Sequence, residues 1–353
     1  MHGRSGKGPC PGLKGGAHRG ACLSASQSGN STLPPVSTHT ALGRVVVAGG
    51  RGFVGASVAT SIRHAGGRVV LLSRQSGAWK EQGGGPLDAP ALLGPQFHDA
   101  SGAVSAVVNA AGTTEVGPQL WEANVEFAER LAEQAGALGV PFVHISSAGV
   151  YGDAKEGVFG EGAPLRPVGA YEISKAVAEK RIAAVAESHK VPCVILRPTI
   201  VFGEGMRNRS LVALVGIARR GLLFRLGPRG AIMNYVAVAN VAEAVVAGLK
   251  HWHKGVGYFN VSQDISFEVF ARVIAGAVGR TAHQRGIPLM TARCLASLSV
   301  VVPGLPLTRS RVDALTRRAS FPAARLAKEL RFREVVGLED ALLEYVGKVQ
   351  GHS

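Results

Sequence analysis

Tyr171 and Lys175 are the residues in this sequence best suited to proton transfer. They stand one helical turn apart, so a helix would place both side chains on one face. A tyrosine hydroxyl has a pKa of about 10 and is a poor acid or base at neutral pH, but a neighbouring ammonium favours the phenolate. We therefore expect Lys175 to lower the pKa of Tyr171. Ser147, at the end of an apolar strand pattern, is placed to hold a substrate oxygen against the tyrosine, which predicts a catalytic site.

A glycine-rich turn lies upstream, between an apolar strand pattern over 44–48 and a helical pattern that ends before a second apolar run over 69–72. In such a turn Gly49 allows the chain to leave the strand, Gly52 lets the backbone approach a pyrophosphate, and Gly55 lets the helix lie close to the sheet. The positive end of the helix then faces the phosphates. We expect a bound dinucleotide to contact Gly49, Arg51, Gly52, Phe53, Val54 and Gly55.

The residues after the second strand indicate which dinucleotide is preferred. Proteins that bind an unphosphorylated ribose carry an acid there, whereas this chain has Ser73 and Arg74 and no acid before Glu81. Arg51 and Arg74 would suit a dianionic 2′-phosphate. The cofactor is expected to be NAD(P), with NADP(H) favoured. Asp88 is expected to border the adenine at the end of a third strand.

Two further strand patterns lead to the same edge of the predicted sheet. The run over 104–112 ends in Ala110 and Ala111, whose small side chains leave room for a ligand above the strand. A helical stripe over 120–138 follows, and the next strand runs over 141–147. His144, within it, is interpreted as a strand residue that is packed or solvated locally.

These motifs together resemble an extended short-chain dehydrogenase/reductase of the NAD-dependent epimerase/dehydratase family, similar to nucleotide-sugar epimerases. The resemblance extends over about 44–346 and implies a Rossmann-type doubly wound parallel sheet with a smaller C-terminal substrate domain. It implies that Ser147, Tyr171 and Lys175 are catalytic, and Asn124 is matched to a supporting asparagine. The motifs that carry it are Gly49–Gly55, Asn109–Gly112, Ser146–Asp153, Tyr171–Lys175, Leu196–Gly203 (which places Pro198 at the cofactor), and Asn234–Val236 with Val241–Ala244.

The sequence also departs from the family at positions that decide the reaction. Sugar dehydratases resembling this chain carry an Asp-Glu pair where it has Ala148 and Gly149. Epimerase-reductases similar to GDP-fucose synthase carry a cysteine in place of Gly149. These differences disfavour 4,6-dehydration and 3,5-epimerisation. Many epimerases also have a phosphate-binding arginine where this chain has Met233.

Three functional hypotheses stay open. The first is an oxidoreductase or epimerase that transfers a hydride on a sugar, probably nucleotide-linked by resemblance to enzymes of lipopolysaccharide sugars, through 4-epimerisation or ketone reduction. The second is an NADPH-dependent reductase of a non-sugar ketone or aldehyde, similar to hydroxysteroid and flavonol reductases, with the apolar segment 295–307 lining its pocket. The third is a non-catalytic cofactor-binding scaffold.

The chain of 353 residues is long enough for more than one domain. Residues 1–42 are rich in Gly, Ser and Pro and contain no acid, so they are expected to form a disordered basic leader, a transit peptide or a misassigned start. A cofactor domain is expected over 43–204 and 235–262, and a substrate domain over 205–234 and 263–346. The residue pattern predicts helices over 206–218 and 267–278, a hairpin-like loop over 224–233 and a strand over 258–261, and the segment 321–330 resembles the family's closing helix.

Charge and cysteine usage exclude several classes of function. The net charge of +15 comes without a recognisable nucleic-acid motif, so no nucleic-acid partner is expected. The four cysteines show no metal-ligand spacing. No run of residues is apolar enough to cross a membrane. We therefore expect a cytoplasmic enzyme. Helices over 120–138 and 171–185 pair in dimers of the family, which implies a homodimer. The C-terminal basic residues, expected mainly as a solvated face, are Arg280, Arg285, Arg293, Arg309, Arg311, Arg317, Arg318 and Arg325.

Overall fold

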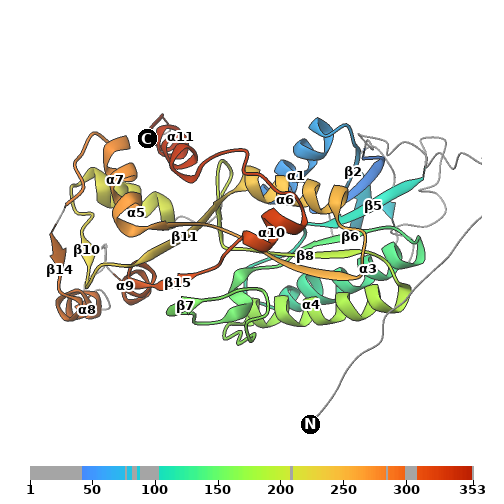
Figure 1. The fold of residues 1–353 in the computed structure, drawn as a ribbon, viewed down its shortest axis with the longest axis horizontal. Coiled ribbons are helices and arrows are strands. Elements are labelled where there is room, and N and C mark those ends of the chain that lie inside the picture. Colours follow the sequence, from blue (N-terminus) through green and yellow to red (C-terminus); the bar gives the residue numbers. More distant parts are fainter. Residues whose placement is uncertain are drawn as a thin grey trace, which may run out of the picture. The chain divides into compact units, whose positions relative to one another are not determined.

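Six parallel strands form the centre of the fold (Figure 1). They are short apolar runs, as strands covered on both faces require, and the side chains of Val45, Val46 and Val47 are fully buried. In the strand order β12-β8-β6-β5-β1-β2, β2 lies on one side of β1 and the later strands lie on the other side. This is the doubly wound arrangement predicted. The strands are β1 (Arg44–Ala48), β2 (Arg68–Gln75), β5 (Val104–Asn109), β6 (Phe142–Ile145), β8 (Cys193–Pro198) and β12 (Val256–Val261).

The computed structural model describes residues 42–75, 78–81, 86–87, 103–206, 210–283, 285–298 and 308–351. Residues 1–41 of the expected leader lie outside these ranges, as does Asp88. From Thr40 onward the chain forms one compact unit. The described part contains no helix that is both long and apolar enough to cross a bilayer.

The edge of the central sheet differs from the prediction. β3 (Ala78–Glu81) and β4 (Pro86–Leu87) continue the sheet beyond β2 in antiparallel orientation. Leu87 therefore does not end a third parallel strand next to the dinucleotide site. Two antiparallel strands need only a short connection, whereas a parallel third strand needs a crossover.

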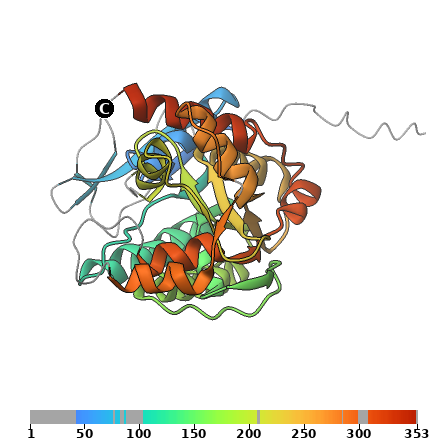
Figure 2. The same ribbon diagram turned by 90° about the vertical axis from the view of Figure 1, so that its left-hand side faces the viewer.

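Helices cover both faces of the sheet (Figures 1 and 2). α1 (Phe53–His64) and α6 (Val238–His251) lie together on one face, and α3 (Phe127–Ala137) and α4 (Ala170–His189) lie together on the other. Each layer has its own apolar core against the sheet. This double cover leaves the carboxyl ends of the strands as the edge where side chains can meet a ligand.

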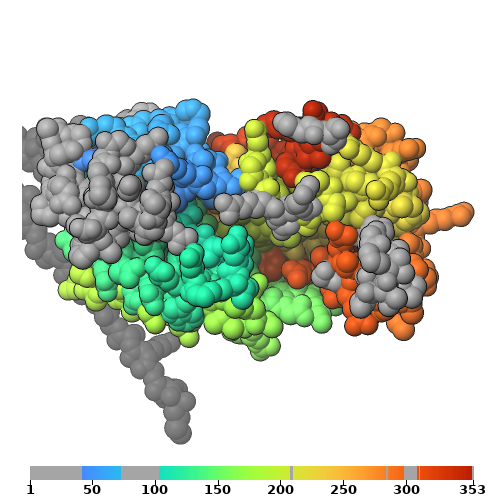
Figure 3. Space-filling view, turned by 180° about the vertical axis from the view of Figure 1, so that it is seen from behind, coloured from blue at the N-terminus to red at the C-terminus, as the bar shows by residue number. Residues whose placement is uncertain are grey.

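A separate apolar core lies under α5 (Ser210–Arg219), α7 (Phe267–Ala277) and α11 (Leu338–Gly351). The ring of Tyr235 stacks on Phe270 at 5.5 Å between centroids. Figure 3 shows the blue surface of α1 and the yellow surface of α5 on opposite halves of one face. The domain boundaries expected from the sequence stay a prediction.

Short strands connect distant parts of the chain. β9 (Ile200–Phe202), β11 (Ile232–Ala237) and β13 (Gln263–Ser266) form a three-stranded sheet. β7 (Glu156–Val158) pairs in parallel with β15 (Arg318–Ser320), far along the sequence. The remaining helices of the C-terminal part are α8 (Leu289–Leu298), α9 (Arg309–Thr316) and α10 (Ala324–Glu329).

The hairpin-like loop expected over 224–233 is wrong. β10 (Arg225–Leu226) pairs in parallel with β14 (Gly286–Ile287), a segment about sixty residues downstream, and β11 begins at Ile232. A local turn pattern cannot reveal a partner that far away.

Candidate functional site

The glycine turn joins β1 to α1 as the sequence indicates. Gly49 has a φ of +76°, and its amide donates to the carbonyl of Leu72 at 2.8 Å. A Cβ on Gly49 would lie 2.7 Å from Cα of Ala111, so only glycine lets the turn lie against the end of β5. A Cβ on Gly55 would lie 2.2 Å from the carbonyl oxygen of Gly49. Gly55 thus packs the helix onto the turn itself.

The N-terminal end of α1 borders a cavity of about 620 Å³. No side chain caps the helix at Gly52, so its first amides are available to an anion. Five of the residues predicted to bind a dinucleotide line this cavity: Gly49, Arg51, Gly52, Ala110 and Ala111.

The other predicted cofactor residues fall in different places. Val54 and Pro198 line a second cavity, of about 440 Å³. Phe53 starts α1 and is half-buried. The backbone of Arg74 lies in β2, but its side chain and all of Asp88 are outside the described residues.

Ser147 and Tyr171 meet at the second cavity. Ser147 follows β6 and caps a 3₁₀ turn, η4 (Ala148–Tyr151), where its Oγ accepts from the amide of Gly149 at 3.0 Å. Tyr171 lies in the first turn of α4, and its hydroxyl interacts with that of Ser147. The two hydroxyls predicted to bind a substrate oxygen therefore lie together at the carboxyl edge of the sheet.

The predicted lowering of the pKa of Tyr171 is wrong in direction. Burial raises this pKa above 10; hydrogen bonding to Ser147 lowers it, and the charge of Glu172 raises it further. Desolvation disfavours the phenolate and outweighs the serine. Lys175 is absent from the groups that set the pKa of Tyr171.

Lys175 is instead held against the backbone of the sheet. Its Nζ donates to the carbonyl of Ile145 at 2.9 Å, and the residue is 4% exposed. Burial lowers the pKa of Lys175 to about 8, opposed by the charge of Glu179. A Cβ on Gly112, which lines the first cavity, would lie 3.3 Å from this ammonium nitrogen. Lys175 therefore lies directly beneath the candidate cofactor cavity.

Asn124 connects the edge of the cofactor cavity to the helix of Tyr171. It belongs to a π-helical turn, η3 (Glu122–Glu126), between α2 (Gln119–Trp121) and α3. The Asn124 amide accepts from the nitrogen of Thr113 at 2.8 Å and donates to the Thr113 carbonyl and to Oγ of Ser174, both at 2.9 Å. The sequence predicted a continuous helix here, and residue types carry no signal for the π turn. Such turns are frequent at functional sites.

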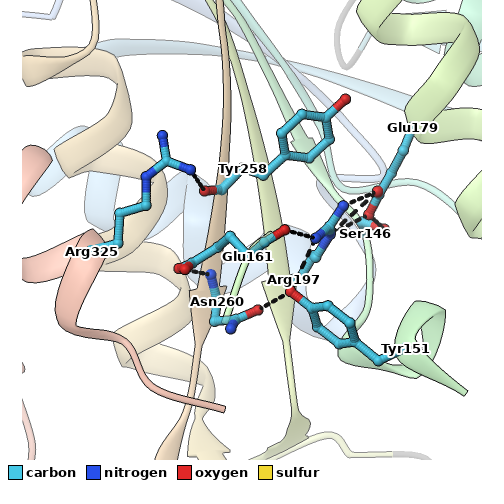
Figure 4. Close-up of polar contacts among 8 residues, drawn as sticks. All are labelled: Ser146, Tyr151, Glu161, Glu179, Arg197, Tyr258, Asn260 and Arg325. Atoms are coloured by element: carbon cyan, nitrogen blue, oxygen red, sulfur yellow. Dashed lines mark hydrogen bonds and ion pairs between the residues drawn. The ribbon is translucent and has the colours of Figure 1, made fainter. Parts of the chain in front are cut away.

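A buried polar network that includes Ser146, the neighbour of Ser147 in the sequence, was not predicted (Figure 4). Glu179 of α4 accepts from Oγ of Ser146 and from Nη2 of Arg197, each at 2.6 Å. Arg197 also donates to the hydroxyl of Tyr151 at 3.0 Å, which donates to Asn260 at 2.8 Å. An arginine within the apolar strand β8 and a glutamate one turn after Lys175 were the available signals. Through Glu179 the network bonds α4 to Ser146, just after β6, and to Arg197 of β8.

His144 is a strand residue, as interpreted, and it is packed rather than solvated. It is fully buried, and its Nδ1 lies 3.2 Å from Nδ2 of Asn109. Burial, followed by the charge of Lys175, holds the pKa of His144 well below its usual value. A neutral imidazole there suits an interior position.

Some of the C-terminal arginines face the protein, and others face cavities. Arg325 pairs with Glu329 at 2.8 Å, and Arg318 donates to the carbonyl of Arg229. Arg317 lines the second cavity, and with Arg311 it also lines an adjoining cavity of about 270 Å³. In the described residues, no cluster of three or more His, Cys, Asp and Glu side chains could hold a metal ion.

The chain is similar in sequence to a family of known enzymes and to individual relatives within it. The sequence profile of the NAD dependent epimerase/dehydratase family matches residues 45–262. The chain is 30% identical over 229 residues to a dTDP-6-deoxy-L-talose 4-dehydrogenase (NAD(P)(+)) of Kitasatospora kifunensis, covering 59% of this chain and 70% of the relative. It is 30% identical over 190 residues to a UDP-glucose 4-epimerase of Vibrio cholerae, covering 50% and 56%. Matches to these two curated relatives thus span about half to seven tenths of their lengths.

The fold is similar to that of a UDP-glucuronic acid 4-epimerase from Bacillus cereus in complex with NAD. That structure superimposes with a TM-score of 0.61 at 16% identity, covering 88% of this chain and 99% of the other. The profile match covers more than half of the sequence and includes the glycine turn, Ser147, Tyr171 and Lys175. The chain therefore belongs to the NAD-dependent epimerase/dehydratase family of enzymes, with the extended short-chain dehydrogenase/reductase fold.

Proposed function

We propose that the protein transfers a hydride on a nucleotide sugar, using NAD(P) and a Ser147-Tyr171-Lys175 site. The observation that carries this proposal is the meeting of Ser147 and Tyr171 at a cavity of about 440 Å³, which Val54 of the helix after the glycine turn also lines. A substrate oxygen held there lies beside the place expected for the dinucleotide.

The residues of the first cavity fit a dinucleotide. After the glycine turn, no side chain caps the backbone amides at the start of α1. Ala110 and Ala111 have small side chains, which leave room for a ligand at the end of β5. Gly49, Gly52 and the first turn of α1 would hold the pyrophosphate. When bound, the nicotinamide accepts or supplies the hydride.

The protein's own groups then handle the proton. Ser147 orients the substrate oxygen, and Tyr171 exchanges a proton with it. Because burial favours the protonated phenol, Tyr171 is suited to give its proton to a carbonyl oxygen as a hydride arrives at carbon. Lys175, whose pKa is about 8, holds a proton beneath this site and would contact the nicotinamide ribose.

The cationic wall supports an anionic substrate. Arg317 lines the second cavity together with Tyr171, and Arg317 and Arg311 line the adjoining cavity of about 270 Å³. Guanidinium groups suit a diphosphate. They would replace the arginine that the family places at Met233. Relatives that act on UDP- and dTDP-linked sugars agree with this substrate class.

We further propose that NADP(H) is preferred, because Arg51 borders the first cavity and no acid follows the start of β2 until Glu81. Cytoplasmic location, homodimer formation and a role in lipopolysaccharide sugars stay proposals by resemblance. The reductase of a non-sugar ketone gains no support from the relatives, and residues 299–307 of its expected pocket are outside the described residues.

The decisive experiment measures binding of NADPH and NADH to the purified protein, with extraction of any cofactor that co-purifies. Turnover of UDP-glucose and dTDP-sugars is then followed, with Tyr171→Phe as the matched variant. We expect Tyr171→Phe to keep cofactor affinity within about twofold and lose about 10²–10⁴-fold in turnover.

Its outcomes separate the possible reactions. Tightly co-purified NAD with interconversion of sugar epimers indicates 4-epimerisation, whereas exchangeable NADPH consumed with a keto-sugar indicates net reduction. Binding of neither dinucleotide, or full turnover by Tyr171→Phe, contradicts the proposed function.

A further inference from the structure

Glu172, the residue after Tyr171, brings a carboxylate to the candidate substrate cavity. Its side chain lines that cavity together with Ser147 and Tyr171 and is half-buried. Across the described part of the chain, its side chain forms no hydrogen bond or ion pair. A carboxylate at a cavity wall without a protein partner is available to accept hydrogen bonds from a ligand.

Two glycines make room for this carboxylate. A Cβ on Gly169 would lie 2.2 Å from Oε2 of Glu172. A Cβ on Gly149 would lie 2.9 Å from Cγ of Glu172 and 3.2 Å from Oγ of Ser147. The glutamate therefore extends over Gly149, in the space next to the serine expected to bind the substrate oxygen.

A purely structural role explains this placement poorly. An acid in the first turn of a helix is favourable next to the helix dipole, and a glutamate at this position can accept from the backbone amide at the start of the helix. That amide is the backbone N–H of Gly169. In the described residues no side chain caps α4 at this position, and Glu172 forms no hydrogen bond with this amide. The dipole does not require the side chain to line a cavity. Its charge also acts on the hydroxyl of Tyr171.

The same cavity carries opposite charges on two walls. Arg317 lines it as well, and among the described residues Arg317 and Glu172 form no ion pair with each other. A diphosphate would bind toward the arginine, which leaves the sugar beside the glutamate. There a carboxylate accepts hydrogen bonds from hydroxyl groups and repels another carboxylate.

We propose that Glu172 is a specificity-determining residue, which binds hydroxyls of a neutral hexose and excludes a hexuronate. This inference rests on the proposed function and adds the class of sugar that the site accepts.

The test compares two probes that differ only at C6 of the sugar, UDP-glucose and UDP-glucuronic acid. Their affinities are measured by calorimetry for the wild-type protein, Glu172→Gln and Glu172→Ala, with UDP alone as the reference. Glu187→Gln is the matched control, because it removes a carboxylate from the exposed far end of the same helix. We expect the wild type to bind UDP-glucose more tightly than UDP-glucuronic acid. Glu172→Gln should reduce that preference by about tenfold and change the affinity for UDP alone by less than about twofold.

The outcomes distinguish the two proposals. If the wild type binds both UDP-sugars and Glu172→Gln and Glu172→Ala leave their ratio unchanged, the role of Glu172 is overturned and the proposed function stands. An equal change in Glu187→Gln also overturns it, because the effect would then be one of net charge. If neither UDP-sugar binds any of the proteins, this assignment fails, and the nucleotide-sugar function fails with it if dTDP-sugars are not turned over either.

Discussion

Lys175 is a buried cation whose only recorded hydrogen-bond partner in the described chain is the carbonyl of Ile145. Its burial imposes a cost on the folded state that depends on pH. Burial lowers the pKa of Lys175 from 10.5 to about 8. Between these values the unfolded chain binds a proton that the folded chain releases, so this residue makes stability rise with pH there.

Lys175→Met should remove this pH dependence. The drop in pKa from 10.5 to about 8 corresponds to about 3 kcal/mol, at about 1.4 kcal/mol for each pH unit. We therefore expect the free energy of unfolding of the wild type, minus that of Lys175→Met, to increase by about 3 kcal/mol from pH 8 to pH 10.5. Urea unfolding of both proteins across this range measures it, and a difference that stays flat would show that Lys175 is solvated.

Arg51 allows cofactor preference to be tested at a single side chain. It is exposed and borders the cavity at the start of α1. We expect Arg51→Ala to weaken NADPH binding about tenfold and to leave NADH binding within about twofold, because only NADPH carries the 2′-phosphate. Fluorescence titration measures both. Arg63→Ala, at the exposed end of the same helix, is the control, and equal losses for the two cofactors would contradict the assignment.

At the scale of secondary-structure elements, the pair of Glu179 and Arg197 fixes α4 against β8. Their side chains are 1% and 4% exposed, and Nη2 lies 2.6 Å from Oε2. Glu179→Gln leaves a buried guanidinium without its counter-charge, which should cost about 3–5 kcal/mol of the free energy of unfolding. Urea denaturation of the wild type and the variant measures this loss.

The matched control is Glu129→Gln, which breaks a pair with Arg181 between α3 and α4. Those side chains are 28% and 40% exposed, so water screens the pair and the loss should be below about 1 kcal/mol. Similar losses for Glu179→Gln and Glu129→Gln would show that the buried network contributes little beyond a surface pair.

The elements with strong local patterns could be predicted from the sequence. Apolar runs placed the strands that form the parallel sheet, and the expected helix over 267–278 is confirmed as α7. Partners far along the chain could not be predicted, because the residue types of β10 and β7 do not specify β14 and β15. The π turn at Asn124 was missed because residue types carry no signal for it.

At the candidate site, the catalytic candidates could be predicted from the sequence, but the direction of the pKa shift of Tyr171 could not. The spacing of Tyr171 and Lys175 placed them on one helix, yet the ammonium is bonded to the sheet backbone and burial dominates the phenol. Burial depends on the whole fold, so no local pattern could give the direction of that pKa shift. Glu172 was likewise unremarkable until the cavity showed what it borders.

At the scale of the whole molecule, a homodimer is the prediction to test. Trp121 on α2 and Ile173 on α4 are each 40% exposed, and these two helices are in contact. Exposed apolar side chains near one another favour an interface. We expect light scattering to give twice the mass of the chain, and Trp121→Asp to shift it toward the monomer. Leu343→Asp, at an exposed leucine of α11, is the control, and a monomeric wild type would contradict the prediction.

The pairing of β7 with β15 has a consequence for biosynthesis. A nascent chain that has emerged from the ribosome as far as α7 already contains Ser147, Tyr171 and Lys175. Arg317 and Phe321, which line the candidate substrate cavity, flank a strand that pairs about 160 residues back along the chain. This part of the cavity wall is thus translated about 160 residues after the strand that it pairs with. An incompletely synthesised chain carries the catalytic candidates without the surface that would select their substrate.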